Sequence, residues 1–297
     1  MPLPSSASSS LAPINCAAHR LVFERPQVMG ILNATPDSFS DGGRYFKGAS
    51  VDLALALERA RQMLAEGAAI IDVGGESTRP GAAPVSEAQE LERVIPVIEA
   101  ITRELGALVS VDTSNPVVMR EAAAAGAGLI NDVRALRREG ALKAAALTGL
   151  PVCLMHMRGE PDNMSDLQTY PDVMREVHDF FSQRLDACEA AGLDRDRVLL
   201  DPGFGFGKTL AQNLTLLRGL SEFQRYQRPL LVGLSRKSLL GALLGRDVDK
   251  RLPGSQALAH ESVLRGANII RVHDVAATSD MISVHLAVQD GWCEKES

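Results

Sequence analysis

Two cations and a histidine in the last quarter of the chain have types and spacings that suit an anionic ligand. Lys237 lies in the run GLSRKS (233–238), and Arg271 and His273 lie in the run IIRVHD (269–274). Because Arg271 and His273 are two residues apart, their side chains share one face of a strand. A guanidinium fork beside an imidazole can hold a phosphate or a diphosphate, although His273 could also be an ordinary structural histidine. Cations at a helix N-terminus are unfavourable unless they meet an anion, so these residues predict an anion site.

A second group of polar residues suits a flat heterocycle. Asp112, Asn131 and Asp201 each end a different apolar run. A carboxylate can accept two parallel hydrogen bonds from an aminopyrimidine edge, and a carboxamide can both donate and accept. Met155 could supply an apolar, polarisable wall. Asp112 has an alternative role as a cap for the next helix, and the sequence leaves both roles open.

The glycine-rich run DPGFGFGKT (201–209) resembles a phosphate-binding P-loop. Only three residues separate Gly203 from Gly207, whereas a P-loop has four between its glycines. We therefore exclude a nucleoside triphosphate site here. The glycines are expected to let the backbone approach a ligand closely, with Phe204 or Phe206 lining it.

Eight short apolar runs carry these polar residues at their C-terminal ends. The runs are predicted strands at 28–33, 69–75, 108–114, 128–132, 151–157, 197–203, 229–235 and 268–274. Amphipathic helical patterns lie between them, and several of these end at a glycine. Eight such units favour an α/β fold of the (β/α)8 type, a TIM barrel, whose active site lies at the C-terminal ends of the strands. The alternative is a doubly wound open sheet.

Length and composition narrow the classes of function. The chain has 297 residues, of which 45% are hydrophobic and 23% charged, and its formal net charge is −6. These values are typical of a globular protein and argue against a nucleic-acid partner. No apolar run reaches the ~18 residues of a membrane span, so no membrane partner is expected. We expect one catalytic domain over 21–290, a flexible tail rich in Ser and Pro over 1–20, and a C-terminal tail over 291–297.

Cysteines and histidines give little support for a protein-built metal centre. The cysteines are far apart and form no CxxC pair; they are Cys16, Cys153, Cys188 and Cys293. This spacing predicts neither a disulfide framework nor a zinc site, and it favours a cytoplasmic protein with reduced thiols. Mg²⁺ is the metal that fits, because Asn33 could hold it together with the phosphates of a substrate.

The order of the motifs resembles that of bacterial dihydropteroate synthases over about residues 28–280. The matching runs are MGILNATPDSFSDGG, IIDVGGESTRPGA, VSVDTS, LINDVRAL, LMHMRG, LLDPGFGFGK, GLSRKS and IIRVHD. Members of that family are (β/α)8 barrels, usually homodimers, that join p-aminobenzoate to 6-hydroxymethyl-7,8-dihydropterin diphosphate. They release diphosphate and 7,8-dihydropteroate, and sulfonamides compete with p-aminobenzoate. The resemblance implies a transferase of folate biosynthesis that uses Mg²⁺ and acts on these small molecules as a homodimer.

The resemblance also implies roles for individual residues. The pterin would be bound by Asp112, Asn131, Met155, Asp201, Phe206 and Lys237. The diphosphate would be held by Asn33, Arg271 and His273, with Mg²⁺ on Asn33. The residues around p-aminobenzoate would be Phe39, Thr78, Arg79, Pro80 and Ser238. Catalytic roles would belong to Lys237, Arg271, His273 and Asp41, the last of which would stabilise a cation that develops as diphosphate leaves.

Two other activities remain as alternatives. A related pterin-binding barrel transfers a methyl group from methyltetrahydrofolate to a corrinoid protein, and an inactive paralogue would bind pterin without turnover. The runs ESTRPG and GLSRKS favour the synthase, because methyl transfer requires no site for a carboxylated amine. The intact Asn33, Lys237 and Arg271 argue against an inactive copy. The run GSQALAHESVL (254–264) departs from the family pattern in a helix where family dimers often pack.

Overall fold

Eight parallel strands form one sheet in the order β10-β9-β8-β7-β6-β3-β12-β11. The computed structural model describes residues 11–34, 46–47, 50–76, 85–159, 164 and 169–290. The strands of the sheet are β3 (Gln27–Asn33), β6 (Ile70–Gly74), β7 (Val109–Asp112), β8 (Leu129–Asp132), β9 (Val152–Met155), β10 (Val198–Asp201), β11 (Leu231–Val232) and β12 (Ile269–Val272). Each strand overlaps one of the eight predicted runs.

The sheet closes into a barrel. Its two outermost strands, β10 and β11, meet through a parallel bridge between Leu200 and Leu230. The backbone N–H of Leu200 also donates to the carbonyl of Pro229 at 2.9 Å. An open sheet would leave its two edge strands apart, so this contact confirms the (β/α)8 barrel and excludes the doubly wound alternative.

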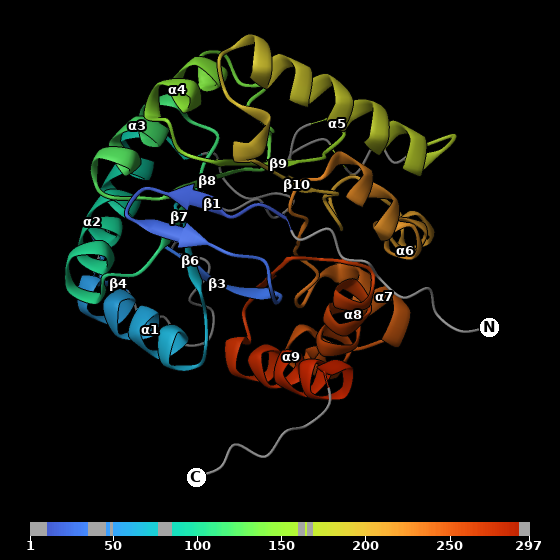
Figure 1. Ribbon diagram of the computed structural model, residues 1–297. Helices are drawn as coiled ribbons and strands as arrows, with labels where there is room; N and C mark the ends of the chain where they lie inside the picture. Colours follow the sequence, from blue (N-terminus) through green and yellow to red (C-terminus); the bar gives the residue numbers. More distant parts are fainter. Residues whose placement is uncertain are drawn as a thin grey trace.

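Helices form a ring around the barrel (Figure 1). They are α1 (Leu53–Ala65), α2 (Glu87–Leu105), α3 (Pro116–Ala124), α4 (Ala141–Thr148), α5 (Val173–Ala190), α6 (Leu210–Arg218), α7 (Ser238–Leu244), α8 (Leu252–Leu264) and α9 (Val275–Asp290). Local signals set their ends. Ser86 and Gln89 form a capping box at the start of α2, and Gly106 ends that helix with a left-handed φ of 56°. Beyond β3 lies a short antiparallel pair, β4 (Phe46–Lys47) and β5 (Ser50–Val51).

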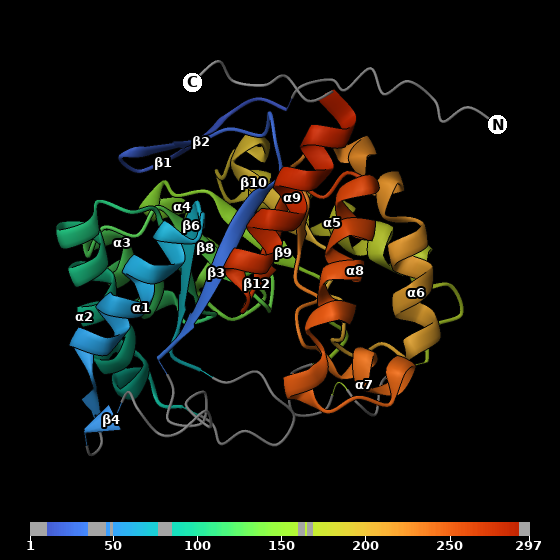
Figure 2. The same cartoon turned by 90° about the horizontal axis from the view of Figure 1, so that it is seen from below.

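A hairpin covers the N-terminal end of the barrel. Its strands are β1 (Ile14–Cys16) and β2 (His19–Leu21), and Figure 2 shows them at one end of the molecule. The side chains of Ile14, Cys16 and Leu21 are 4%, 0% and 4% exposed and pack against the barrel interior beside Met29. The predicted flexible tail over residues 1–20 is therefore wrong at 14–20, because apolar side chains of this segment close the bottom of the barrel.

The buried apolar residues form three clusters. The largest lies between the strands and the surrounding helices, and the second lies under the hairpin. A small third cluster joins Val133, Met155, Met157 and Met164 to Phe206 beside the strand ends. Within the described part of the chain, no helix combines the length and apolar character needed to cross a membrane. The expected C-terminal tail at 291–297 lies outside the described residues.

Candidate active site

Arg271 lies among the strand ends and contacts two carboxylates. Its Nε donates to Oδ2 of Asp72 at 2.6 Å, and its Nη2 donates to Oδ2 of Asp112 at 2.7 Å. The three residues belong to β12, β6 and β7, whose C-terminal ends share one face of the barrel. Because a planar guanidinium held at two nitrogens has a fixed orientation, Arg271 is firmly placed. The structure thus brings two predicted site residues, Arg271 and Asp112, into direct contact.

Asp72 is a site residue that the sequence analysis did not assign. Its side chain is 0% exposed, and its Oδ2 also accepts a hydrogen bond from Nδ2 of Asn131 at 3.2 Å. Its Oδ1 has no hydrogen-bond partner among the described residues. The available signal was a carboxylate inside an apolar strand, IIDVG, since an aspartate is rarely buried without a partner. Asp72 therefore links the predicted anion ligand Arg271 to the predicted pterin ligand Asn131.

Burial and neighbouring charges determine the protonation of this cluster. Burial raises the pKa of Asp112 to about 7, and the adjacent Arg271 opposes that rise. Burial by itself lowers the pKa of Arg271, but the carboxylates of Asp72 and Asp112 outweigh it and the net shift is upward. The site therefore holds a permanent cation beside a carboxyl group that titrates near neutral pH.

A buried lysine fixes the glycine-rich loop that follows β10. Lys208 is 5% exposed, and its Nζ donates to the carbonyls of His156, Gly203 and Phe206 at 3.2, 2.8 and 3.1 Å. Gly203 has a left-handed φ of 69°, and a Cβ there would lie 1.8 Å from the carbonyl oxygen of His156. Only glycine fits that position. Lys208 binds its own loop, in agreement with the exclusion of a P-loop.

Asp201 and Lys237 bring opposite charges to the same loop. Asp201 is 6% exposed, and its Oδ1 accepts the backbone N–H of Gly203 at 2.7 Å. Lys237 donates from Nζ to the carbonyl of Phe204, and this Nζ lies 4.2 Å from the ring centroid of Phe206. Burial lowers the pKa of Lys237 to about 8, against the effect of Asp201. Burial likewise raises the pKa of Asp201, against the effect of Lys237.

An apolar wall stands beside these polar groups. Met155 is 3% exposed and belongs to the small cluster that includes Phe206. Phe204 is 0% exposed and belongs to the main core. Of the two phenylalanines considered from the sequence, Phe206 is therefore the one beside the site.

Asn33, His273 and Ser238 lie on elements around the same end of the barrel. Asn33 ends β3 in register with Gly74 of β6. His273 follows β12, and its backbone N–H donates to Oγ of Ser235 at 3.2 Å, while its Nδ1 lies 3.1 Å from that oxygen. Ser238 is exposed as the first residue of α7.

The helix-cap alternative applies to other residues than Asp112. The N-cap of α3 is Asn115, whose Oδ1 accepts the N–H of Val117 at 2.8 Å. Asp132 organises its own turn, because its carboxylate accepts the backbone N–H groups of Arg134 and Leu136 at 2.8 and 2.7 Å. The Asp112 carboxylate instead accepts a hydrogen bond from Nη2 of Arg271.

Five residues predicted for the site lie outside the described residues. They are Phe39, Asp41, Thr78, Arg79 and Pro80, which belong to the segments following β3 and β6. Among the residues that the structure describes, no three His, Cys, Asp or Glu side chains come together to hold a metal ion. Asn33 would contribute one amide oxygen, a donor set that suits Mg²⁺ when substrate phosphates supply further oxygens.

Comparisons with known proteins extend over almost the whole chain. Residues 29–273 match the family model described as pterin binding enzyme. The dihydropteroate synthase of Escherichia coli K12 is 53% identical over 264 residues, which cover 89% of this chain and 92% of that protein. The Yersinia pestis dihydropteroate synthase solved with a sulfonamide drug complex has a TM-score of 0.90 and 51% identity, covering 94% of this chain and 100% of that one. The Xanthomonas albilineans enzyme with 4-aminobenzoic acid has a TM-score of 0.87 and 48% identity, covering 94% and 99%.

Proposed function

The chain belongs to the dihydropteroate synthase family of pterin binding enzymes, and we propose that the cluster around Arg271 is the site at which it acts. It is a transferase of folate biosynthesis that joins p-aminobenzoate to 6-hydroxymethyl-7,8-dihydropterin diphosphate, giving 7,8-dihydropteroate and diphosphate. The observation that carries the site assignment is the contact of Arg271 with both Asp72 and Asp112 at the strand ends.

The pterin ring binds between the polar strand ends and the apolar wall. The carboxylates of Asp112 and Asp201 accept hydrogen bonds from its amino and ring N–H groups, and the amide of Asn131 both donates and accepts. The side chains of Met155 and Phe206 contact the flat faces of the ring. Lys237, whose ammonium already lies over the Phe206 ring, donates to an acceptor of the pterin.

Pterin binding changes the contacts of Arg271. In this structure Nη2 of Arg271 donates a hydrogen bond to Oδ2 of Asp112. The aminopyrimidine edge of the pterin would donate to the same oxygen. The pterin takes over that oxygen, while Nε of Arg271 keeps its contact with the buried Asp72. The released Nη2 can then donate to the diphosphate of the same substrate. Binding of the pterin end thereby frees one nitrogen of Arg271 for the diphosphate end.

Arg271 and His273 hold the diphosphate, and Asn33 is the residue that would hold Mg²⁺. When bound, Mg²⁺ would supply positive charge that favours departure of the diphosphate. The carbon–oxygen bond to diphosphate breaks with its electron pair going to the leaving group, and Asp41 stabilises the positive carbon. The neutral amine of p-aminobenzoate then forms the carbon–nitrogen bond and loses one proton to water. A neutral aniline nitrogen needs no strong base.

Among the described residues, Ser238 is the one proposed to contact p-aminobenzoate. Ser238 follows the pterin ligand Lys237 directly, so the two substrates meet at this loop. The other residues proposed to surround p-aminobenzoate are Phe39, Thr78, Arg79 and Pro80. Sulfonamides are expected to bind here, since the related Yersinia pestis enzyme was solved with a sulfonamide drug complex.

We further propose that the protein is a cytoplasmic homodimer. The last three helices each carry exposed apolar side chains; they are Leu243, Leu244, Leu252, Leu264, Val284 and Val288. A second copy of the chain would remove such side chains from water. The buried free thiols of Cys16, Cys153 and Cys188 fit a reducing compartment. Light scattering should give twice the chain mass of 31.8 kDa, and a monomer would contradict the dimer.

The decisive experiment measures diphosphate release from the dihydropterin diphosphate, with and without p-aminobenzoate and with and without Mg²⁺. We expect dihydropteroate only when p-aminobenzoate is present, and release that depends on Mg²⁺. Pterin binding without release would contradict the synthase. A methyltetrahydrofolate binding assay would then separate a methyl-transfer barrel from an inactive paralogue.

A further inference from the structure

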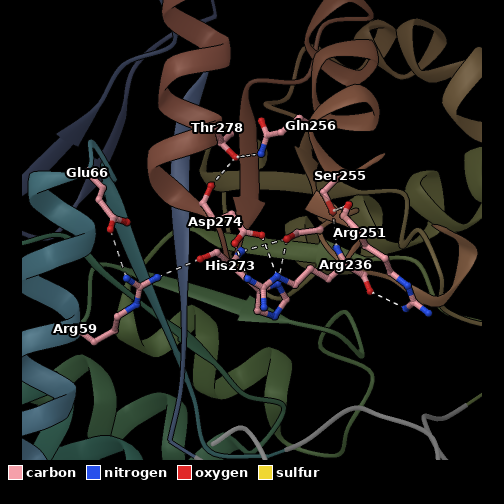
Figure 3. A network of polar contacts seen from close by, with 10 residues as sticks. Arg59, Glu66, Arg236, Arg251, Ser255, Gln256, His273, Asp274 and Thr278 are labelled. Carbon is pink, nitrogen blue, oxygen red and sulfur yellow. Dashed lines mark hydrogen bonds and ion pairs between the residues drawn. The ribbon is translucent and has the colours of Figure 1, made fainter. Parts of the chain in front are cut away.

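The segments that follow β11 and β12 are joined by two adjacent side-chain contacts. Oγ of Ser235 lies 3.1 Å from Nδ1 of His273. Nε and Nη2 of Arg236 donate to the two carboxylate oxygens of Asp274 at 2.9 and 2.5 Å. Two consecutive residues of one segment thus contact two consecutive residues of the other, as Figure 3 shows for Arg236, His273 and Asp274. We call these four residues the loop clasp.

We propose that Arg236 and Asp274 are positioning residues for the transfer reaction, a role that rests on the proposed function. Neither is assigned a contact with substrate. Arg236 directly precedes Lys237 and Ser238, and Asp274 directly follows His273. The clasp therefore fixes the ligands of pterin and p-aminobenzoate relative to a ligand of the diphosphate. A two-point ion pair between an arginine and a carboxylate sets both distance and orientation, which a reaction between two bound substrates requires.

The backbone of Arg236 is held in an unfavourable conformation that supports this role. Its φ of 57° is left-handed, which residues other than glycine rarely adopt. Its N–H donates to Oγ of Ser255 at 2.9 Å, and its carbonyl accepts from Nη1 of Arg251 at 3.1 Å. Such a conformation persists only where the surroundings impose it. Both backbone groups of Arg236 are thus anchored from α8 and the residue before it while its side chain reaches Asp274 (Figure 3).

The other half of the clasp is anchored mainly to α9 and α1. The carbonyl of Asp274 accepts from Oγ1 of Thr278 at 2.9 Å, and that hydroxyl accepts from Nε2 of Gln256 at 3.1 Å. The carbonyl of His273 accepts from Nη2 of Arg59 at 3.1 Å. The Asp274 side is therefore attached directly to α9 and α1, and through Thr278 and Gln256 also to α8, the helix that holds the Arg236 side. The ion pair connects the segment after β11 to the segment after β12.

If the ion pair between Arg236 and Asp274 served only to stabilise the fold, its loss would lower the melting temperature, and kcat would fall only as the protein unfolds. The side chains of Arg236 and Asp274 are 34% and 17% exposed, and partly exposed ion pairs contribute little to the stability of a protein. Losing the pair should therefore leave the melting temperature close to that of the wild type. If the pair positions the reacting groups, kcat falls although the protein remains folded.

A double-mutant cycle on the full-length protein tests the proposal. The variants are Arg236→Met, Asp274→Asn and the combination of both, and the readouts are kcat, the KM of each substrate and the melting temperature. We expect each single change to lower kcat by about 10- to 100-fold, the usual consequence of small displacements of reacting groups. The double variant should be no slower than the slower single variant, because either change already breaks the ion pair.

A gentler variant and a matched control complete the experiment. Arg236→Lys keeps the charge and loses the fork, so its kcat should lie between those of the wild type and Arg236→Met. Arg195 makes equally short contacts with Asp186 and Glu189, at 2.5 and 2.9 Å, just before β10 begins. Arg195→Met removes that ion pair at the opposite end of the barrel and should leave kcat unchanged.

Three results would overturn the proposal. They are wild-type kcat in both single variants, losses that multiply in the double variant, and losses that only follow a smaller folded fraction. Failure of the proposed function would look different, because the wild-type protein would then form no dihydropteroate.

Discussion

Nη2 of Arg271 and Oδ2 of Asp112 lie 2.7 Å apart, although the two residues are assigned to opposite ends of one substrate. The side chain of Asp112 is 15% exposed, whereas that of Asp72, the second partner of Arg271, is 0% exposed. The buried contact can persist through turnover, and the more accessible one is where a ligand competes. The geometry therefore suits an arginine that exchanges one partner for the diphosphate and keeps the other.

Removal of the Arg271 side chain should affect both activity and stability. Arg271→Ala leaves the buried Asp72 uncompensated, which should cost about 3–5 kcal/mol in the free energy of unfolding and abolish turnover. Arg271→Lys keeps the charge without the fork, so it should retain most of the stability and lose about 100-fold or more in kcat/KM. Urea unfolding and steady-state kinetics measure the two effects. Near-normal turnover in Arg271→Lys would contradict the anion-site assignment.

The efficiency of the enzyme should pass through a maximum near pH 7–8. Protonation of Asp112 below its pKa of about 7 removes the carboxylate that accepts the pterin N–H groups. Deprotonation of Lys237 above its pKa of about 8 removes a cationic donor. A profile of kcat/KM for the pterin substrate, at saturating p-aminobenzoate, should fall on both sides. The profile of the Asp112→Asn variant should lack the fall at low pH. If that fall is unchanged in the variant, it is caused by the ionisation of another group.

Asp72→Asn should shift the acid limb of that profile to lower pH. The negative charge of Asp72 raises the pKa of Asp112, so removing it makes Asp112 easier to ionise. The same change loosens Arg271, and kcat/KM should fall about tenfold because one charge-assisted hydrogen bond is weakened. A pH profile of this variant beside the wild type measures both effects. A limb that stays at the wild-type pH would show that Asp72 does not control the ionisation of Asp112.

Gly203→Ala and Gly192→Ala form a matched pair of backbone tests. Both glycines have left-handed φ angles, 69° and 84°, so each alanine should cost about 1–2 kcal/mol of strain. A Cβ at Gly192 meets nothing within 4 Å, whereas one at Gly203 lies 1.8 Å from the carbonyl oxygen of His156. Only Gly203→Ala should also displace the loop of Asp201 and weaken pterin binding, as measured by calorimetry. Equal pterin affinity in the two variants would contradict the placement of this loop in the pterin site.

The hairpin at the bottom of the barrel should contribute stability and no chemistry. Ile14 is 4% exposed, and Ile14→Ala should lower the free energy of unfolding by about 2–5 kcal/mol through lost burial and a cavity. The kinetic constants should remain at wild-type values, because the hairpin and the site lie at opposite ends of the strands. Leu147→Ala, at a position 71% exposed, is the control and should change stability little. If Ile14→Ala and Leu147→Ala give the same unfolding curve, the hairpin contributes little to the stability of the barrel.

The positions and the parallel direction of the strands, and the identity of the strand-end residues, were determined by the sequence alone. The apolar runs are short, nearly continuous and separated by helical patterns, which favours parallel strands covered on both faces. Parallel strands of one barrel all end on the same face, so Asp112, Asn131 and Asp201 had to meet there. The motif order was specific enough to identify the dihydropteroate synthase resemblance, which the relative with 53% identity over 264 residues confirms.

Tertiary structure decided which of these polar residues contact one another. Arg271 and Asp72 are separated by 199 positions in the chain, and their 2.6 Å contact depends on the curvature that brings β12 and β6 to the two sides of β3. Asp132 and Asp112 look alike as strand-end aspartates, yet one caps a turn and the other contacts a cation. The hairpin was missed for the same reason. Its three buried side chains pack against the N-terminal end of the barrel, a surface that forms only when the barrel closes. Sequence patterns record the periodicity and direction of each segment, whereas side-chain pairing depends on distances between segments that only the closed barrel fixes.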